Sequence, residues 1–278
     1  MITLHHLESS GSHRIIWLLE ELDLSYQIER HQVNPETGAV DSALQAIHPL
    51  AKAPVLVDDK QVVAGCGAIM DYILNKYDRS GLRPPITSSD YTQYQQWMFY
   101  SDSQLLPLFQ QQARYEKLAN TRVPFFARSI LKKVVNGVLS GPIATEIAQH
   151  LNYIEDQLSA NGWSSGSQFS AADIQLSFAL ETAKSKGLID AKQFPNLDSF
   201  LNAIAERSAY QVAQEKAGSK VYALPVSTEP EISDDENSSS AAEDSNNQGE
   251  PNHQAFDGAS SETGIEAGNG SGNGNSQR

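Results

Sequence analysis

Three hydroxyl side chains lie within four residues near the start of the chain, in the run Ser9-Ser10-Gly11-Ser12. Serine often begins a helix, and apolar residues recur at helical spacing over residues 15–22 directly afterwards. A hydroxyl donor and the positive end of that helix would converge on an anion bound at this turn. The structural alternative is that the serines only cap the helix.

Cys66 is the only cysteine. It cannot form an intramolecular disulfide, fits a reducing compartment and cannot supply ordinary zinc spacing, so we predict no metal site. A thiol at a helix start can also have a lowered pKa and exchange with disulfides, although most single cysteines are inert packing residues.

The negative charge is concentrated at the carboxyl end. The chain has a net charge of −14, and residues 225–278 hold eleven carboxylates against one base, Arg278. Large apolar residues are rare there, so burial cannot offset the entropy of ordering the segment, and we predict a disordered acidic tail. The rest of the chain has no basic stripe that would track a phosphate backbone, which argues against nucleic acid as a partner.

The first 80 residues predict a mixed α/β domain. Short apolar runs indicate strands at residues 2–7, which include His5 and His6, and at 26–33, and two more strands form a hairpin at 54–63. Helical spacing indicates helices at 15–22 and 65–77, with a weak helical piece at 42–47. The order is therefore β-α-β-α-β-β-α.

Residues 81–90, with Pro84-Pro85, form a predicted linker, and residues 91–224 form a predicted all-helical domain. Apolar residues at spacings of three and four follow Gly141-Pro142, which predicts a helix starting there with proline in its first turn. Ser170 and Asp173 have the spacing of a capping box. No N-terminal leader or membrane-spanning stretch is evident, so we expect a cytoplasmic protein without a membrane partner.

Five segments in one order resemble the cytosolic glutathione transferase family and cover roughly residues 1–218. They are LESSGSHRIIWLLEELDLSY, HPLAKAPVLVDDKQV, GCGAIMDYIL, FSAADIQLSFAL and FPNLDSFLNAIAERSAYQVAQEKAG. Within the family, WLLEEL and WMFYSDSQLLP look most like bacterial and fungal members with a serine-type site. The resemblance implies a thioredoxin-like N-terminal domain, an all-α C-terminal domain, glutathione as co-substrate and a homodimer.

The resemblance places the serine that stabilises the glutathione thiolate at Ser10 or Ser9, with Ser12 third. The thiolate is the nucleophile in glutathione conjugation, and lowering the thiol pKa by one unit requires about 1.4 kcal/mol of preferential stabilisation of the anion.

Further binding residues are also implied by the resemblance. Pro54 matches a cis-proline that frees the backbone of Ala53 to pair with glutathione, and Lys52 would reach the glycine carboxylate. The alternatives are a trans proline opening a strand and a solvated lysine.

Gly65-Cys66 departs from the family, which usually has an acidic residue or glutamine followed by serine here to hold the γ-glutamyl group. We therefore expect weakened glutathione binding, or another partner for the amine. Asp102 aligns with an acidic residue that reaches this amine across a dimer interface in relatives, while a solvated carboxylate is the alternative.

Three functions follow from these patterns. The leading one is an enzyme that conjugates glutathione to hydrophobic electrophiles. The second is a glutathione-dependent isomerase, suggested by the serine-rich turn although WLLEEL argues against it. The third is a transferase-like binding module without catalysis, suggested by Gly65-Cys66 and the tail.

Overall fold

The computed structural model describes residues 1–8, 10–34 and 40–218. The predicted disordered tail at residues 225–278 and the candidate residue Ser9 lie outside this description. None of the helices in the described ranges is both long and apolar enough to cross a membrane.

Four strands form one mixed sheet in the order β2-β1-β3-β4. They are β1 (Ile2–Leu7), β2 (Tyr26–His31), β3 (Val55–Asp58) and β4 (Gln61–Ala64). The central strand β1 is parallel to β2 and antiparallel to β3, with Leu4 opposite Ile28 on one side and Leu56 on the other. β3 and β4 form the predicted hairpin.

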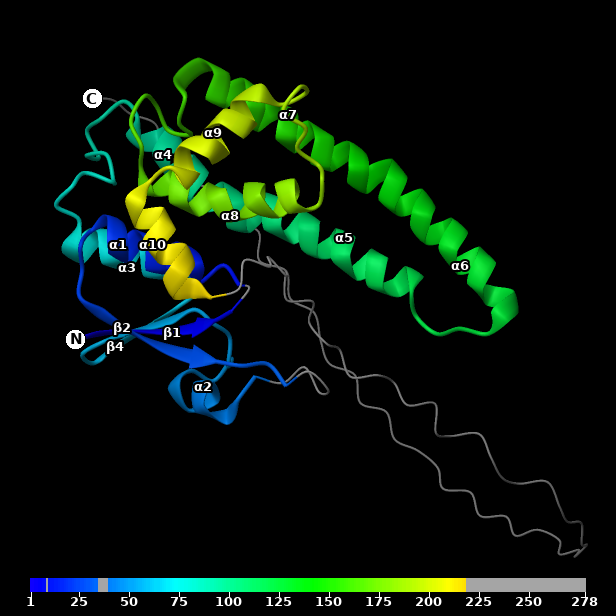
Figure 1. Ribbon diagram of the computed structural model, residues 1–278, viewed down its shortest axis with the longest axis horizontal. Helices are drawn as coiled ribbons and strands as arrows, with labels where there is room; N and C mark the ends of the chain where they lie inside the picture. Colours follow the sequence, from blue (N-terminus) through cyan, green and yellow to red (C-terminus); the bar gives the residue numbers. More distant parts are fainter. Residues whose placement is uncertain (9, 35–39, 219–278) are drawn as a thin grey trace, which may run out of the picture. The chain divides into compact units, whose positions relative to one another are not determined.

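Helices α1 (His13–Glu21) and α3 (Cys66–Tyr77) lie on one side of this sheet and α2 (Ser42–Ile47) on the other (Figure 1). The apolar stripes predicted for α1 and α3 are buried in one core with Leu4 and Leu56. The predicted element order is thus confirmed, and the domain is thioredoxin-like.

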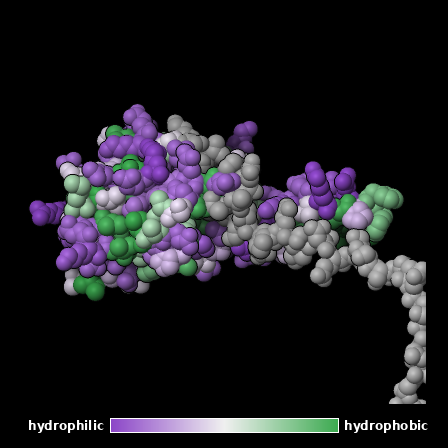
Figure 2. Space-filling model, turned by 90° about the horizontal axis from the view of Figure 1, so that it is seen from below, coloured by the Kyte–Doolittle hydropathy of each residue, from purple (hydrophilic) through white to green (hydrophobic). Residues whose placement is uncertain are grey.

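The second domain is helical. It contains α4 (Tyr91–Tyr100), α5 (Leu106–Ala119), α6 (Phe125–Val138), α7 (Ala144–Asn161), α8 (Ala171–Ser185), α9 (Pro195–Ala205) and α10 (Ser208–Ala217), with π-helical turns at Ser101–Leu105 and Leu139–Ile143. Most of α8 is buried, whereas apolar side chains such as Phe125 and Phe126 are exposed at the end of the α5–α6 hairpin (Figure 2).

Pro142 does not begin a helix, contrary to the sequence prediction. It lies within the π-helical turn Leu139–Ile143, which joins α6 to α7. Proline inside an α-helix removes one hydrogen bond and clashes with the carbonyl four residues earlier, and the wider π turn relieves that crowding. The hydroxyl groups of Ser140 and Thr145 donate to the carbonyls of Asn136 and Gly141 in this region.

The predicted capping box fixes the start of α8. Ser170 N donates to Asp173 Oδ2 at 2.8 Å, and Ser164 N donates to the other carboxylate oxygen, also at 2.8 Å. The bond from Ser170 satisfies a donor at the start of α8, and the bond from Ser164 ties the preceding loop to the same carboxylate. They hold in place the helix that carries Gln175 and Phe178.

The last helix, α10, packs against α1 at the edge of the sheet. Its C-terminal carbonyl, on Ala217, accepts a hydrogen bond from His6 Nε2 of β1 at 2.8 Å, and Arg30 of β2 donates to the neighbouring carbonyl of Lys216. The N-terminal sheet and the end of the helical domain are therefore joined by hydrogen bonds.

Candidate functional site

Most of the side chains singled out in the sequence meet in one cleft of about 400 Å³. The loop before α1, the loop before β3 and the start of α3 form one wall, and α5 and α8 contribute the other. The lining residues are Ser10, Gly11, Arg14, His48, Leu50, Lys52, Ala53, Pro54, Ala64, Gly65, Cys66, Asp102, Leu106, Pro107, Gln110 and Phe178.

Of the predicted serines, Ser10 reaches the cleft and Ser12 lies behind it. The hydroxyl of Ser10 donates to the Leu7 carbonyl at 2.7 Å and is also 2.7 Å from Ser12 Oγ. Ser12 is the residue before the first turn of α1, but its side chain makes no helix-capping bond and instead lies 2.6 Å from His6 Nδ1. The serines therefore form a network within the loop rather than capping α1.

Arg14 is buried at the wall of the cleft and binds several polar groups there. Its Nη1 donates to Asp102 Oδ1 at 3.0 Å and to the side-chain oxygen of Gln175 at 2.9 Å. Gln175 in turn donates to the other oxygen of Asp102 at 2.8 Å. Burial of a guanidinium requires such partners, and here they fix the carboxylate of Asp102 at the cleft.

Gly11 is required for the packing of Arg14. A Cβ atom at this position would lie 2.6 Å from Arg14 Nη2, inside contact distance. Arg14 Nε also donates to the Gly11 carbonyl at 3.1 Å, so the guanidinium is held against the backbone and cannot move away without losing hydrogen bonds.

The peptide bond between Ala53 and Pro54 is cis, as the resemblance implied. The Pro54 carbonyl accepts a hydrogen bond from Gly65 N at 3.0 Å, which places the start of α3 beside the Ala53 backbone. Lys52 is exposed at the rim of the cleft.

Gly65 and Cys66 begin α3 at the cleft wall. Gly65 has a backbone φ of 90°, a conformation that residues other than glycine rarely adopt. The Cys66 thiol is 8% exposed and donates to the Gly11 carbonyl at 3.3 Å. Burial raises the pKa of this thiol, and the nearby Arg14 guanidinium opposes that effect without cancelling it. A protonated, buried thiol argues against the disulfide-exchange role.

Sequence reasoning missed two groups at this site. Arg14 and Gln175 were each only part of a resembling segment and received no role. Their places depend on contacts among three elements: α1, α8 and the π-helical turn that follows α4. Arg14 and Gln175, which bind each other, are 161 positions apart in the sequence.

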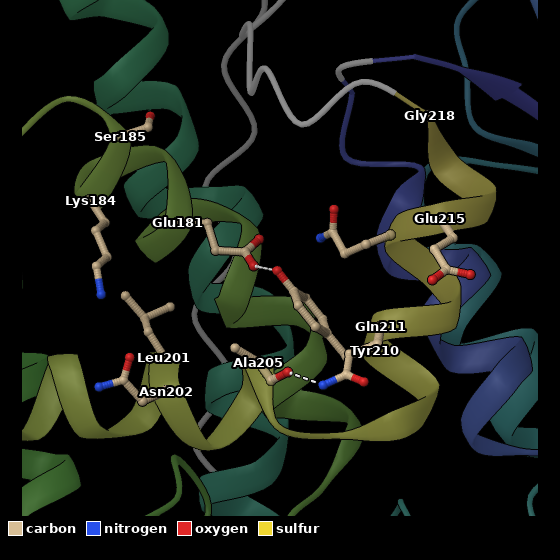
Figure 3. A pocket seen from close by; sticks show the side chains of 11 residues that line it. Glu181, Lys184, Ser185, Leu201, Asn202, Ala205, Tyr210, Gln211, Glu215 and Gly218 are labelled. Carbon is tan, nitrogen blue, oxygen red and sulfur yellow. Dashed lines mark hydrogen bonds between the residues drawn. The ribbon is translucent and has the colours of Figure 1, made fainter.

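A larger hollow of about 810 Å³ lies between α8, α9 and α10 and contains none of the predicted site residues (Figure 3). The Tyr210 hydroxyl donates to Glu181, and Gln211 donates to the Ala205 carbonyl at 2.9 Å. Lys184 pairs with Asp198 at 2.8 Å. Several polar groups of this hollow thus bind protein groups, and we assign the site to the smaller cleft, where the predicted residues meet.

Comparisons with known proteins agree on one family. The profile described as Glutathione S-transferase, N-terminal domain, matches residues 1–75, and that of the C-terminal domain matches residues 140–211. Glutathione S-transferase 3 of Schizosaccharomyces pombe is 31% identical over 224 residues, covering 81% of this chain and 91% of the relative.

Two solved structures share the fold. A glutathione S-transferase from Actinobacillus pleuropneumoniae is 30% identical, with a TM-score of 0.63 over 80% of this chain and 94% of that one. A sphingomonad glutathione S-transferase, solved in complex with glutathione, is 21% identical with a TM-score of 0.60 over 78% of this chain and 98% of that one.

Proposed function

The chain belongs to the glutathione S-transferase family, and from that membership we propose that it joins reduced glutathione to hydrophobic electrophiles through a serine-stabilised thiolate. Its enzymatic class is that of the family, glutathione S-transferase. The observation that carries the finer proposal is the convergence of Ser10, cis Pro54, the start of α3 and Asp102 on one cleft.

Glutathione would lie across this cleft with its cysteine portion beside Ala53. The backbone of that residue is open to pairing because the following peptide bond is cis. The γ-glutamyl carboxylate would bind the N–H groups at the start of α3, a twelve-residue helix. Lys52, exposed at the rim, would reach the glycine carboxylate.

Asp102 lines the cleft of its own chain, and there it would hold the γ-glutamyl amine in place of the acidic residue that relatives have at the position of Gly65. Its Oδ2 lies 3.9 Å from the Cβ position that would be built on Gly67, so the carboxylate stands over the first turn of α3. The side chain is 37% exposed, which leaves room for a ligand amine beside Arg14. A charge-assisted bond of this kind contributes roughly 1.5–3 kcal/mol.

The electrophile would occupy the apolar side of the same cleft. Leu106 and Pro107 of α5 and Phe178 of α8 face the serine loop there. Burial of an apolar substrate against these groups contributes about 25 cal/mol per Å² of apolar area removed from water.

The remaining expectations form part of this proposal. The domains are 1–80 and 91–224 with a linker at 81–90, and the enzyme is a cytoplasmic homodimer. Phe99 on α4 and Val62 on β4 are 65% and 47% exposed, and these exposed apolar side chains support the homodimer. The free Cys66 thiol supports a reducing compartment.

A binding module without catalysis is the second candidate. The observation that favours it is the inward hydrogen bond from Ser10 to the Leu7 carbonyl, together with a weakly donating thiol at Cys66. Calorimetry with glutathione and turnover of a chlorinated dinitrobenzene separate the candidates. We expect both binding and turnover. Binding without turnover would favour the module, and absence of both would contradict the proposed site.

A further inference from the structure

The end of the α5–α6 hairpin carries concentrated positive charge in an otherwise acidic chain. Residues 103–145 hold six bases and a single carboxylate, Glu116, whereas the whole chain has a net charge of −14. Glu116 already pairs with Lys186 at 3.2 Å. All six bases are exposed, and within the described ranges none of them forms an ion pair. They are Arg114, Lys117, Arg122, Arg128, Lys132 and Lys133.

Large apolar side chains are exposed on the same hairpin. Phe126, Ile130 and Val134 of α6 recur at intervals of four residues, so they form one stripe along the helix, and they are 69%, 66% and 61% exposed. Phe125, the first residue of the helix, is 88% exposed and its ring packs edge-on against that of Phe126. Single exposed apolar residues are ordinary, but a contiguous set of this kind is typical of a binding surface.

The apolar and charged groups occupy different sides of α6. Arg128 and Lys132 are each two residues from Ile130 and therefore lie about 160° around the helix from the centre of the stripe, while Lys133 borders it. Val135 is the one buried residue of this helix, so most of its surface is open to a partner. The two helices of the hairpin extend past the other helices (Figure 1), and hydrophobic and hydrophilic side chains lie together at their end (Figure 2).

The surface of a membrane that contains anionic phospholipid fits both properties. An interfacial helix buries its apolar stripe at the boundary between head groups and acyl chains, while Lys and Arg on its polar side bind the phosphates. The projecting end of a hairpin is convex, so a rigid partner would need a matching groove, whereas a bilayer adapts to the shape. Charge complementarity and exposed aromatic side chains thus favour the same partner.

We propose that the end of the α5–α6 hairpin docks reversibly on membranes that contain anionic phospholipid. Phe125, Phe126 and Ile130 enter the head-group region, and the surrounding bases bind the lipid phosphates. An interfacial helix needs neither a leader nor a membrane-spanning length. The lack of both in the sequence, from which we expected no membrane partner, therefore does not bear on this kind of contact.

The proposed function would give this contact a use. Leu106 and Pro107 of the cleft begin α5, and the fourteen residues of that helix lead to the end of the hairpin, about 20 Å away. Hydrophobic electrophiles concentrate in lipid, so docking would bring the cleft close to their source. Docking itself does not depend on conjugation, and the two are measured separately.

Co-sedimentation of the full-length chain with lipid vesicles tests the proposal. Vesicles of phosphatidylcholine alone are compared with vesicles of phosphatidylcholine and phosphatidylserine in equal parts. We expect binding to the mixed vesicles only, weakening as added salt screens the charges. Absence of binding to either kind of vesicle, or equal binding to both, would overturn the proposal. A chain that binds the mixed vesicles but turns over no chlorinated dinitrobenzene would contradict the proposed function alone.

Two double variants separate the apolar and charged contributions. Phe126→Ser/Ile130→Ser interrupts the stripe, and Lys132→Gln/Lys133→Gln removes two of the bases. Each should weaken binding to the mixed vesicles at least about tenfold, since one lysine near an anionic surface contributes roughly fivefold. All four side chains are exposed and lie outside the cleft, so turnover of chlorinated dinitrobenzene should be unchanged, which shows that the variants fold.

Ile86→Ser and Lys192→Gln are the controls, because both side chains are exposed and neither lies on the hairpin. Their vesicle binding should equal that of the wild type, and a similar loss in them would overturn a specific docking surface. Loss in the lysine variant with none in Phe126→Ser/Ile130→Ser would indicate an acidic protein partner. A changed oligomeric state of Phe126→Ser/Ile130→Ser in size-exclusion chromatography would show that a second copy covers the stripe. Either result would overturn membrane docking.

Discussion

The guanidinium of Arg14 donates to the carboxylate of Asp102 at 3.0 Å, although 88 positions separate the two residues. This pair connects α1 of the thioredoxin-like domain to the π-helical turn after α4. Arg14 is buried, and Asp102 is partly open to the cleft. The carboxylate thus has two partners in the protein, Arg14 and Gln175, and its exposed side leaves room for a ligand.

Replacing Asp102 by Asn should weaken glutathione binding about tenfold, because the ligand amine loses a charge-assisted hydrogen bond. Calorimetry measures the affinity. A glutathione analogue without the γ-glutamyl amine should bind wild type and variant equally. Asp198→Asn, which removes a carboxylate paired with Lys184 outside the cleft, is the control. Equal loss of affinity for both ligands would show that Asp102 acts only through Arg14.

Replacing Ser10 by Ala should lower the conjugation rate by roughly 10²-fold, the usual effect of removing a donor to a resident anion. Steady-state turnover of a chlorinated dinitrobenzene measures it. Ser177→Ala is a matched control, since that buried hydroxyl donates to the Ile174 carbonyl of its own helix. If Ser9→Ala shows the loss instead, Ser9 is the thiolate serine. Full turnover in the double variant would refute the serine assignment.

Cys66→Ser should tighten glutathione binding several-fold, because a hydroxyl is a stronger donor than a thiol at the start of α3.

The side chain added in Gly65→Glu has space, because no heavy atom lies within 4 Å of the new Cβ, but the residue must adopt a backbone φ of 90°. We expect that change to cost roughly 1–3 kcal/mol of stability, measured by denaturant unfolding. A Gly65→Glu variant as stable as wild type would contradict this account.

Asp58 should make the thioredoxin-like domain acid-sensitive. Burial raises the pKa of this carboxyl, but hydrogen bonds from Lys76, Tyr77 and Tyr72 outweigh it and lower the pKa to about 2. Because the pKa is lower in the folded state than its unfolded value of 3.8, the ionised carboxylate stabilises the fold at pH values above 3.8. This contribution to the free energy of unfolding is lost as the pH falls through about 2.

Asp58→Asn should therefore cost roughly 2 kcal/mol at neutral pH, and the difference from wild type should shrink as the pH falls from about 4 to about 2. Denaturant unfolding across that range measures it. Asp59→Asn is the neighbouring control, because its carboxylate is exposed and pairs only with the N-terminal amine among the described residues. A difference that did not depend on pH would indicate lost packing rather than lost charge.

Local patterns predicted the elements well because they depend on neighbours along the chain. The stripe of Ile147, Leu151, Ile154 and Leu158 is buried on α7, as its spacing predicted. The same stripe did not reveal that Pro142 lies in a π-helical turn between two helices. Apolar periodicity does not distinguish the start of a helix from such a turn. The geometry of such a turn depends on tertiary packing.

The candidate site was predicted in part. The start of α3 and the serine loop were identified because the resemblance fixed their positions in the chain. Arg14 and Gln175 were missed, since each owes its place to residues far away in sequence. His5 and His6 were interpreted as strand residues, which β1 confirms, but the alternation of a strand does not say that His6 meets both Ser12 and Ala217.

The bond between His6 and the Ala217 carbonyl spans 211 positions. During synthesis the amino-terminal strands emerge from the ribosome long before that carbonyl exists, and domains generally begin to fold in the order in which they are made. A nascent chain halted before α10 would have its sheet but no acceptor for His6. Formation of this bond is thus tied to the end of translation of the helical domain, and His6 gains its carbonyl partner only once α10 has been made.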